Sequence, residues 1–396
     1  MELTDKLDIL GTAAKYDVCA ASSCSASASP KAPRGLGTLS SAPICHSWTP
    51  DGRCVSLFKV LQTNVCKNNC RYCQNRCSND INRISFTPEE LAKTFIEFYK
   101  RNYVEGLFLS SGIKGSSAQT MSEMIKTVDI VRNVHHFNGY IHLKVLPGIE
   151  PAQIEEAARL ATRLSINVEA PTQKALLQIA GEKDLEKDII QPMALIQQQK
   201  KLGRLPGGHT TQFVVGAAGE SDQEIMRTTF WLYQKRDLNR AYFSAFINSD
   251  AHLSKESLTR EHRLYQADFL YRKYKFTEKE IVFNNDGLLD LDLDPKLALA
   301  LRQPAVFPLE VNKSSYEELL RVPGIGPQSG RRLVTIRREH RFTDLKELKN
   351  VGVVIKRAAP FITINGKKQG SLNKFMAKPK QLSFDLGGQF LLPAAA

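Results

Sequence analysis

Short apolar runs alternate with amphipathic stretches between residue 55 and about residue 250. The apolar runs have the length of buried strands, and between them apolar positions three or four residues apart mark one face of a helix. The predicted strands cover residues 55–62, 105–110, 140–146, 163–169, 211–216 and 241–247. The predicted helices cover residues 88–101, 118–134, 152–160, 173–180, 185–201 and 222–236. Six β-then-α units predict a mostly parallel α/β sheet, either doubly wound or curled into a barrel.

The chain on either side of this region has a different pattern. Residues 1–54 are predicted to form an N-terminal extension, with a short helix at 1–15 and irregular structure where Ala, Ser and Pro dominate. Its cysteines (Cys19, Cys24, Cys45 and Cys54) suggest either a second metal site or free thiols in a lid. Residues 251–310 are predicted to bridge to a small all-α domain at 311–365. Residues 366–396, rich in Gly, Lys, Gln and Ser, are expected to be a flexible basic tail.

Three cysteines lie close together in the segment Cys66-Lys67-Asn68-Asn69-Cys70-Arg71-Tyr72-Cys73, after the first predicted strand. Thiolates so near in sequence can converge on one inorganic centre, and soft sulfur ligands suit zinc or an iron–sulfur cluster. A structural zinc site normally takes four protein ligands, whereas a [4Fe–4S] cluster on three cysteines leaves one iron open. The residues alone leave zinc, a cluster and buried thiols as alternatives.

The C-x3-C-x-aromatic-C spacing after a first strand resembles the cluster loop of radical S-adenosylmethionine (SAM) enzymes. The resemblance implies that Cys66, Cys70 and Cys73 bind a [4Fe–4S] cluster whose open iron binds SAM. It also implies that Tyr72 packs near the SAM adenine. In that family an electron from the cluster cleaves SAM to a 5′-deoxyadenosyl radical. The fold implied is a partial (βα)6 TIM-like barrel rather than an open sheet.

Polar and glycine residues gather at the predicted carboxyl ends of the strands, where α/β folds bind ligands. The resemblance assigns SAM contacts to residues that end the second to fifth strands: Ser110, Ser111, Gly112, Lys144, Asn167, Glu169, Gly216 and Gly219. The segment Ser110-Ser111-Gly112 departs from the Gly-Gly-Glu of the family. Lys144 shares a strand face with His142, and a solvated lysine is the alternative to a SAM contact there.

A second motif lies at Val322-Pro323-Gly324-Ile325-Gly326-Pro327. The spacing of Ser314 and Glu317 predicts a capped helix over 314–320, and Pro327 can begin a second helix that runs to 338. Helix, glycine turn and helix resembles the helix-hairpin-helix DNA-binding module, whose turn amides receive a phosphate. The predicted DNA-binding residues are Gly324, Ile325, Gly326, Arg331 and Arg332, with Arg337 and Arg338 as added phosphate contacts. A degenerate second copy is predicted, with Thr343 as a helix cap and Gly352 in its turn; an ordinary helical hairpin is the alternative.

The formal net charge of +13 is concentrated near the C-terminus. Residues 301–396 hold 17 Lys plus Arg against 7 Asp plus Glu, which is +10, and residues 1–300 hold 37 against 34, which is +3. This asymmetry favours a polyanion partner, nucleic acid first, although a solvated basic tail would have the same composition. No stretch has the apolar length of a membrane span and the N-terminus has no signal-peptide pattern, so we expect a cytoplasmic protein without membrane contact.

With the Cys45-His46 pair and the segment Asp51-Gly52-Arg53-Cys54, the arrangement as a whole resembles putative DNA modification or repair radical SAM proteins. This implies a radical enzyme that acts on a nucleotide in DNA and takes its electron from a flavodoxin or ferredoxin. Cys45, Cys54 and Cys77 are candidates for returning a hydrogen atom, against the alternative of structural thiols.

Three other interpretations stay open. One is modification of tRNA or rRNA by the same chemistry. Another is a glycosylase-like DNA-binding protein with a structural iron–sulfur cluster, for which Cys77 would be the fourth ligand. The last is a non-catalytic DNA-binding scaffold with zinc. Separately, the tail peptide Gln381-Leu382-Ser383-Phe384-Asp385-Leu386 is similar to peptides that bind the bacterial sliding clamp, which makes the clamp a further expected partner.

Overall fold

The computed structural model describes residues 3–14, 44–48, 54–247 and 254–372. Contacts divide the chain into two compact units: unit 1 is Met1–Glu220 with Arg227–Ser257, and unit 2 is Ser221–Met226 with Leu258–Ala396. The described residues include no helix that is long and apolar enough to cross a membrane. The predicted clamp-binding peptide at 381–386 lies outside the described residues.

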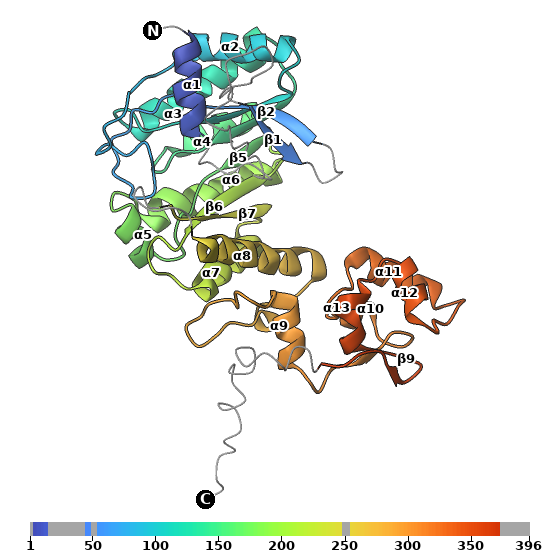
Figure 1. The fold of residues 1–396 in the computed structure, drawn as a ribbon. Helices are drawn as coiled ribbons and strands as arrows, with labels where there is room; N and C mark the ends of the chain where they lie inside the picture. The colour runs from blue at the N-terminus through green and yellow to red at the C-terminus, as the bar shows by residue number, and fades with distance from the viewer. Residues whose placement is uncertain (1–2, 15–43, 49–53, 248–253, 373–396) are drawn as a thin grey trace, which may run out of the picture. The chain divides into compact units, whose positions relative to one another are not determined.

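Unit 1 is built on a seven-stranded sheet whose strands are neighbours in chain order (Figure 1). The strands are β1 (Ile44–Trp48), β2 (Cys54–Leu61), β3 (Gly106–Ser110), β4 (Tyr140–Lys144), β5 (Arg163–Ser165), β6 (His209–Val215) and β7 (Arg240–Ala245). Strands β2 to β7 run parallel, and β1 pairs antiparallel with β2. A doubly wound sheet would reverse its strand order at a switch point. This sheet does not, and the predicted partial (βα)6 barrel is confirmed.

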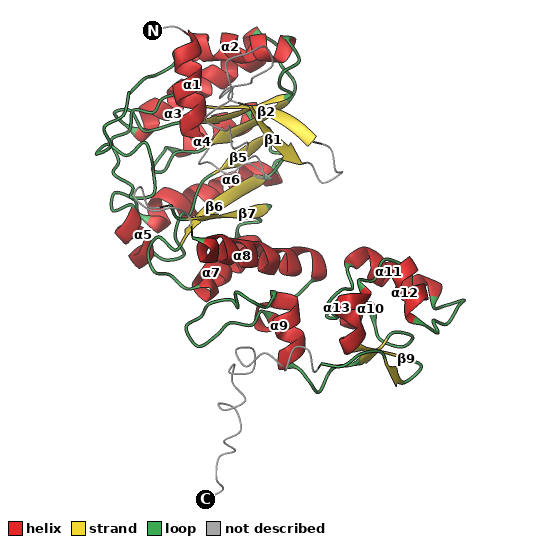
Figure 2. Cartoon of the chain, viewed as in Figure 1, coloured by secondary structure: helices red, strands yellow, loops and turns green. Residues whose placement is uncertain are grey.

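Helices alternate with these strands (Figure 2). They are α1 (Leu3–Ala14), α2 (Pro88–Lys100), α3 (Ser117–Asp129), α4 (Pro151–Leu160), α5 (Gln173–Ile179), α6 (Gln191–Lys201) and α7 (Asp222–Lys235), with π-helical turns η1 (Ile130–Val134) and η2 (Glu186–Ile190). Successive helices pack on one another, α2 on α3, α3 on α4 and α4 on α6. This is the layer that a right-handed run of βα units places outside a curled sheet.

Two features of unit 1 differ from the predictions. The fourth predicted strand ends early, because β5 stops at Ser165 and the chain turns at Glu169, which has a φ of +65° and joins Phe213 through an isolated bridge. The edge strand β1 was not predicted. It has only five residues, Ile-Cys-His-Ser-Trp, whose mixed polarity gives no strand pattern, and it pairs with the strand that follows it.

Unit 2 holds most of α8 (Lys255–Tyr274) and a compact C-terminal part. Its elements are η3 (Glu278–Glu280), α9 (Pro295–Arg302), α10 (Tyr316–Leu319), α11 (Pro327–Ile336), α12 (Leu345–Asn350), α13 (Ile355–Ala358), η4 (Ala359–Phe361) and strands β8 (Leu309–Glu310), β9 (Ile362–Ile364) and β10 (Lys367–Lys368). Apolar side chains of α9, α10, α11 and β9 share one core. Residues 258–310, predicted as a bridge, therefore cluster with the helical hairpins.

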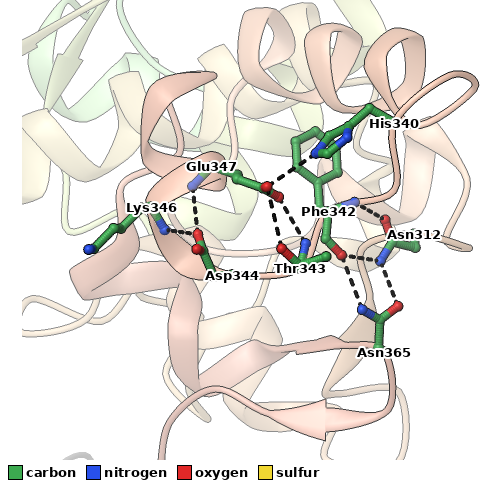
Figure 3. Close-up of polar contacts among 8 residues, drawn as sticks. All are labelled: Asn312, His340, Phe342, Thr343, Asp344, Lys346, Glu347 and Asn365. Carbon is green, nitrogen blue, oxygen red and sulfur yellow. Dashed lines mark hydrogen bonds and ion pairs between the residues drawn. The ribbon is translucent and has the colours of Figure 1, made fainter.

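Two predicted helix caps are wrong by one residue. The cap of α10 is Ser315 with Glu318, not Ser314 with Glu317, because the Ser314 amide already donates to the Glu310 carbonyl and closes a turn. The cap of α12 is Asp344, whose carboxylate accepts the amides of Lys346 and Glu347 (Figure 3). Thr343 instead donates its amide to the Glu347 carboxylate.

Candidate functional site

A cavity of about 170 Å³ opens at the carboxyl ends of the strands of unit 1. Every strand from β2 to β7 contributes to its wall, directly or through the loop that follows it. The residues that line it include Cys66, Cys70, Tyr72, Cys73, Ser110, Ser111, Gly112, Lys144, Asn167, Glu169, Lys183, Gln212 and Ser244. This is the edge at which parallel α/β sheets bind ligands, since the loops there converge. The structure thus brings the three cysteines and seven of the predicted SAM-contact residues together around one space.

The cysteine loop, residues 64–83, follows β2 and is held in shape from within. The Arg83 guanidinium donates hydrogen bonds to the backbone carbonyls of Asn64 (2.7 Å), Asn75 (2.8 Å), Arg76 (2.6 Å) and Asn79 (2.9 Å). A planar group with five donors can hold four carbonyls at once, whereas an ammonium group has only three donors. Sequence reasoning missed Arg83, because its partners are backbone atoms that no side-chain motif marks.

The same loop is fastened to α5 and the segment after it. The Arg71 amide donates to the Ile179 carbonyl at 2.8 Å, and the Asn69 amide donates to the Glu182 carboxylate at 3.0 Å. The thiols that border the cavity are therefore positioned by contacts with the β5–β6 connection as well as by the loop itself.

Lys183 joins this connection to the site, and sequence reasoning missed it as well. Its ammonium donates to the Tyr72 hydroxyl at 2.8 Å and lies 3.6 Å from a Glu169 carboxylate oxygen. Burial lowers the pKa of Lys183, but the charges of Glu169, Cys70 and Cys73 outweigh burial and raise it overall. Lys183 is therefore a buried cation beside two of the cysteines.

Charge and burial affect the neighbours of Lys183 in opposite ways. Burial raises the pKa of the Cys70 thiol, and the Lys183 ammonium offsets part of that rise. Burial, followed by the Glu169 carboxylate, raises the pKa of the Tyr72 phenol well above its usual range. Tyr72 is thus a neutral phenol that accepts a hydrogen bond from Lys183 and lines the cavity.

Two buried polar atoms on the cavity wall have no hydrogen-bond partner among the described residues. They are the Ser111 hydroxyl oxygen and the second carboxylate oxygen of Glu169. A buried polar group without a partner costs about 1–3 kcal/mol, so such atoms are usually satisfied by water or a ligand. Their place on the wall of the cavity favours a polar ligand there.

The interior of the sheet below this cavity is polar and basic. Lys144, Asn167 and Gln212 border both the main cavity and a small one of about 10 Å³ beneath it. His142 lies in the lower cavity and its ring bonds the Ser165 hydroxyl at 2.8 Å. Burial, then the charges of Arg163, Lys144 and Lys59, hold the pKa of His142 well below its usual range. The shared face predicted for His142 and Lys144 is confirmed by this lining.

Gly216 and Gly219 do not line the cavity. Both have positive φ, +87° and +69°, in the turn between β6 and α7. The Glu220 carboxylate closes that turn by accepting the backbone amides of Gly216 and Ala218. The glycines are accounted for by the turn geometry, and a SAM contact at either position stays a prediction.

Two of the three candidate hydrogen donors, Cys45 and Cys77, are not among the residues that line the cavity. Cys45 packs with Leu57 and Phe108, and Cys77 is exposed. Cys54 begins β2, but its side chain lies outside the described part of the chain. A role for any of the three in hydrogen transfer stays a prediction.

In unit 2 the predicted hairpin, Gly324-Ile325-Gly326 (hairpin 1), lies between α10 and α11. Gly324 has a φ of +89°, and a Cβ there would lie 2.6 Å from the Val354 carbonyl, so only glycine fits. Within hairpin 1 the Ile325 amide donates to the Val322 carbonyl and the Gly326 amide to the Ser329 hydroxyl. Backbone donors for a phosphate would therefore come mainly from the first turn of α11.

Arginines that follow hairpin 1 divide into two kinds. Arg331, Arg332 and Arg338 are exposed. Arg337 is half-buried, and its guanidinium donates to the carbonyls of Val311 and Ser314. Arg337 therefore holds the start of this part of the fold through Nη1, and a phosphate contact by its other nitrogens stays a prediction.

The second turn, Val351-Gly352-Val353 (hairpin 2), packs against the first. Its three amides donate to carbonyls of α12, and the Val354 amide donates to the Gly324 carbonyl at 2.9 Å. Hairpin 2 thus keeps no amide for a ligand and supports hairpin 1, as predicted for a degenerate copy. The segment before α12 is fixed by Asn312 and Asn365, whose side chains bond the Phe342 backbone (Figure 3).

Comparison with known proteins identifies both regions. A model of the radical SAM superfamily matches residues 60–232, and a helix-hairpin-helix model matches residues 308–359. A search of curated proteins finds no significant match.

Among solved structures, the chain is similar to the FeFe-hydrogenase maturase HydG from Carboxydothermus hydrogenoformans, with 13% identity, a TM-score of 0.41 and coverage of 53% of this chain and 49% of that one. It is also similar to methylornithine synthase (PylB), with 17% identity, a TM-score of 0.40 and coverage of 52% and 60%. SuiB from Streptococcus suis, solved with SAM bound, is similar with 11% identity, a TM-score of 0.40 and coverage of 54% of this chain and 44% of that one. The chain spans about half the length of these proteins, and the family model alone carries the assignment.

The residues present fit the cofactors of the radical SAM superfamily, a [4Fe–4S] cluster and SAM. Three thiols with the spacing of that family line the cavity, and the unpartnered oxygens of Ser111 and Glu169 suit a polar ligand. In the described part of the chain no three His, Cys, Asp or Glu side chains gather around a single ion position; a cluster differs, since each cysteine binds its own iron. The chain therefore contains a radical SAM domain at residues 60–232 and a helix-hairpin-helix motif at residues 308–359.

Proposed function

We propose that this protein is a radical SAM enzyme that acts on DNA, with Cys66, Cys70 and Cys73 as cluster ligands. The observation that carries the proposal is the convergence of these thiols with two unpartnered polar oxygens on one cavity at the ligand-binding edge of the sheet. When bound, the cluster and SAM supply a 5′-deoxyadenosyl radical that can abstract a hydrogen atom from a substrate.

The residues of the chain bind and orient SAM around that chemistry. Tyr72 offers an aromatic face of fixed orientation, because Lys183 holds its hydroxyl. Glu169 and Ser111 supply a hydrogen-bond acceptor and a hydroxyl to the polar groups of SAM. Gly112 lets the end of β3 pack directly on the start of the cysteine loop, since a Cβ there would lie 2.5 Å from the Val65 carbonyl. Lys144 and Asn167 extend the polar wall toward the interior of the sheet.

DNA is the proposed substrate because the helix-hairpin-helix motif presents exposed arginines beside a helix N-terminus, in the strongly basic end of the chain. Contacts of this kind reach phosphates and do not read sequence. A base stacked in a duplex cannot enter a cavity of this sort, so the target nucleotide is expected to be flipped out or already distorted. RNA is the rival substrate that shares the same backbone chemistry.

The test is reconstitution of the cluster under anaerobic conditions, followed by incubation with dithionite and SAM and measurement of 5′-deoxyadenosine. We expect product from wild type and none from Cys70→Ala. A Cys77→Ala variant that loses iron would favour four-cysteine ligation and the glycosylase-like reading. A reconstituted protein that binds no SAM and makes no 5′-deoxyadenosine would refute the radical SAM proposal.

The substrate is tested separately by adding duplex DNA or duplex RNA of matched length to the reductive reaction. We expect binding to DNA and a DNA-dependent product detected by mass spectrometry after nuclease digestion. Modification of RNA in place of DNA would refute the DNA assignment while leaving the cofactor chemistry intact.

A further inference from the structure

A lysine of α9, Lys296, contacts the backbone of hairpin 1. Lys296, in the first turn of α9, is 7% exposed, and its ammonium donates a hydrogen bond to the Ile325 carbonyl. Ile325 is the middle residue of hairpin 1. A second carbonyl of hairpin 1, that of Gly324, accepts a hydrogen bond from the Val354 amide. Hairpin 1 is thus held by hairpin 2 at Gly324 and by Lys296 at Ile325.

The surroundings of Lys296 are basic overall. Its ammonium lies 4.7 Å from the centre of the Tyr274 ring of α8, and the Tyr274 hydroxyl approaches Gly326 closely enough that a Cβ there would lie 3.4 Å from it. Arg357 of α13 and Arg321, at the end of α10, also face this site. Each is paired with a carboxylate, Arg357 with Asp294 and Arg321 with Glu280.

Burial and the two arginines destabilise the ammonium form of Lys296, and Asp294 stabilises it. Burial, followed by the Arg357 charge, lowers the pKa of Lys296 to about 7, with Asp294 opposing and Arg321 adding to the effect. Near neutral pH the ammonium therefore exchanges with a neutral amine. An amine still donates a hydrogen bond to a carbonyl, so the contact with Ile325 is available in both forms.

We propose that Lys296 is a positioning residue of a phosphate site at hairpin 1, and that binding of a nucleic-acid phosphate there is coupled to uptake of a proton by Lys296. The proposal rests on the proposed nucleic-acid function of the motif. A phosphodiester placed on the turn adds a negative charge beside a buried, poorly solvated lysine, and an opposite charge favours the protonated form.

The sign of the coupling follows from linkage. The bound state holds more protons than the free state, so affinity falls as pH rises through the pKa of free Lys296 and up to its higher value in the complex. Below that window both states are protonated, and affinity no longer depends on this group. One proton limits the effect to about a tenfold loss of affinity per pH unit.

The experiment uses the full chain and a fluorescein-labelled DNA duplex, with fluorescence anisotropy at constant ionic strength from about pH 6 to about pH 9. For wild type we expect the Kd to rise several-fold per pH unit above neutrality. Lys296→Arg keeps a charge that does not titrate and is expected to bind with little pH dependence. Lys296→Met is expected to bind weakly at every pH. Lys279→Met, at an exposed lysine of unit 2, serves as the control that titrates like wild type.

Equal pH slopes in wild type and Lys296→Arg would overturn the inference while leaving the proposed function standing. Failure of wild type to bind DNA at any pH would refute the proposed function and this inference with it. A measurement that needs no variant is the binding enthalpy of wild type near pH 7 in buffers with different heats of ionisation. Proton uptake on binding is expected, and no uptake would also overturn the inference.

Discussion

Replacing Arg83 with methionine is expected to release the cysteine loop and to weaken its hold on a cluster. The guanidinium makes four hydrogen bonds to backbone carbonyls, each about 1.5–3 kcal/mol for a charged donor. The side chain is only half-buried, so water replaces part of what is lost. A net cost of about 3 kcal/mol follows, which is about a hundredfold in cluster affinity if the loop must be ordered to bind.

The assay is iron retention in reconstituted protein during competition with a chelator, followed by absorbance. Arg83→Lys is expected to recover only part of the loss, because one ammonium cannot reach four carbonyls. Arg71→Met is the matched control in the same loop, since its side chain is exposed and makes a single long contact of 3.4 Å to the Gln178 carbonyl. Equal iron retention by Arg83→Met and Arg71→Met would refute this account of the loop.

Three further predictions concern unit 2. Replacing both Arg331 and Arg332 with alanine should remove about two phosphate contacts, which reduces the slope of log affinity for DNA against log salt concentration by roughly 1.8. The melting temperature should not change in this variant, whereas Arg337→Ala should lower it. An unchanged slope would show that Arg331 and Arg332 do not contact phosphate. Gly324→Ala should destabilise unit 2 by more than the roughly 1 kcal/mol expected of Gly366→Ala. Both glycines have positive φ, but only at Gly324 would the added Cβ clash with a backbone atom. Equal losses of stability for the two variants, measured by calorimetry, would contradict this. Because the pKa of Lys296 is lowered to about 7 in the folded chain, the unfolded chain binds more protons than the folded chain above that pH. The melting temperature of wild type, relative to that of Lys296→Met, should therefore rise between about pH 7 and about pH 10. A constant difference between the two melting temperatures would argue against a buried, titrating lysine.

The elements of unit 1 were predictable where local pattern and tertiary role agree. Strands β2, β3 and β7 are largely apolar runs in a parallel sheet, so their sequence signal is strong, and β6 is marked by its apolar end at Phe213, Val214 and Val215. Strand β1 escaped prediction because it is short and mixes apolar and polar residues, although it pairs with the next strand along the chain. The early end of β5 at Ser165 escaped because the alternation continues to Glu169 while the backbone leaves the ladder.

For the site, residues with a motif were found and residues without one were not. Cys66, Cys70 and Cys73 have a diagnostic spacing, and Glu169 ends an alternating run. Lys183 lies in a loop more than a hundred residues after the cysteines. It belongs to the site because the fold brings it beside Tyr72, and a local sequence pattern does not reveal such a contact. Lys296 and Arg83 contact backbone carbonyls, and such contacts depend on the fold and leave no side-chain signature.

The internal fastening of the cysteine loop has a consequence for how the protein acquires and loses iron. In small zinc domains the metal supplies much of the folding free energy, so removing the metal unfolds the chain. Here the loop owes its shape to a guanidinium, to backbone bonds and to anchoring on the following connection. Oxidative loss of a cluster would then leave the cysteine loop in its folded conformation. Restoring the cluster then needs iron and sulfide to be delivered to a folded loop and needs no refolding, so the damaged protein can be repaired without being made anew.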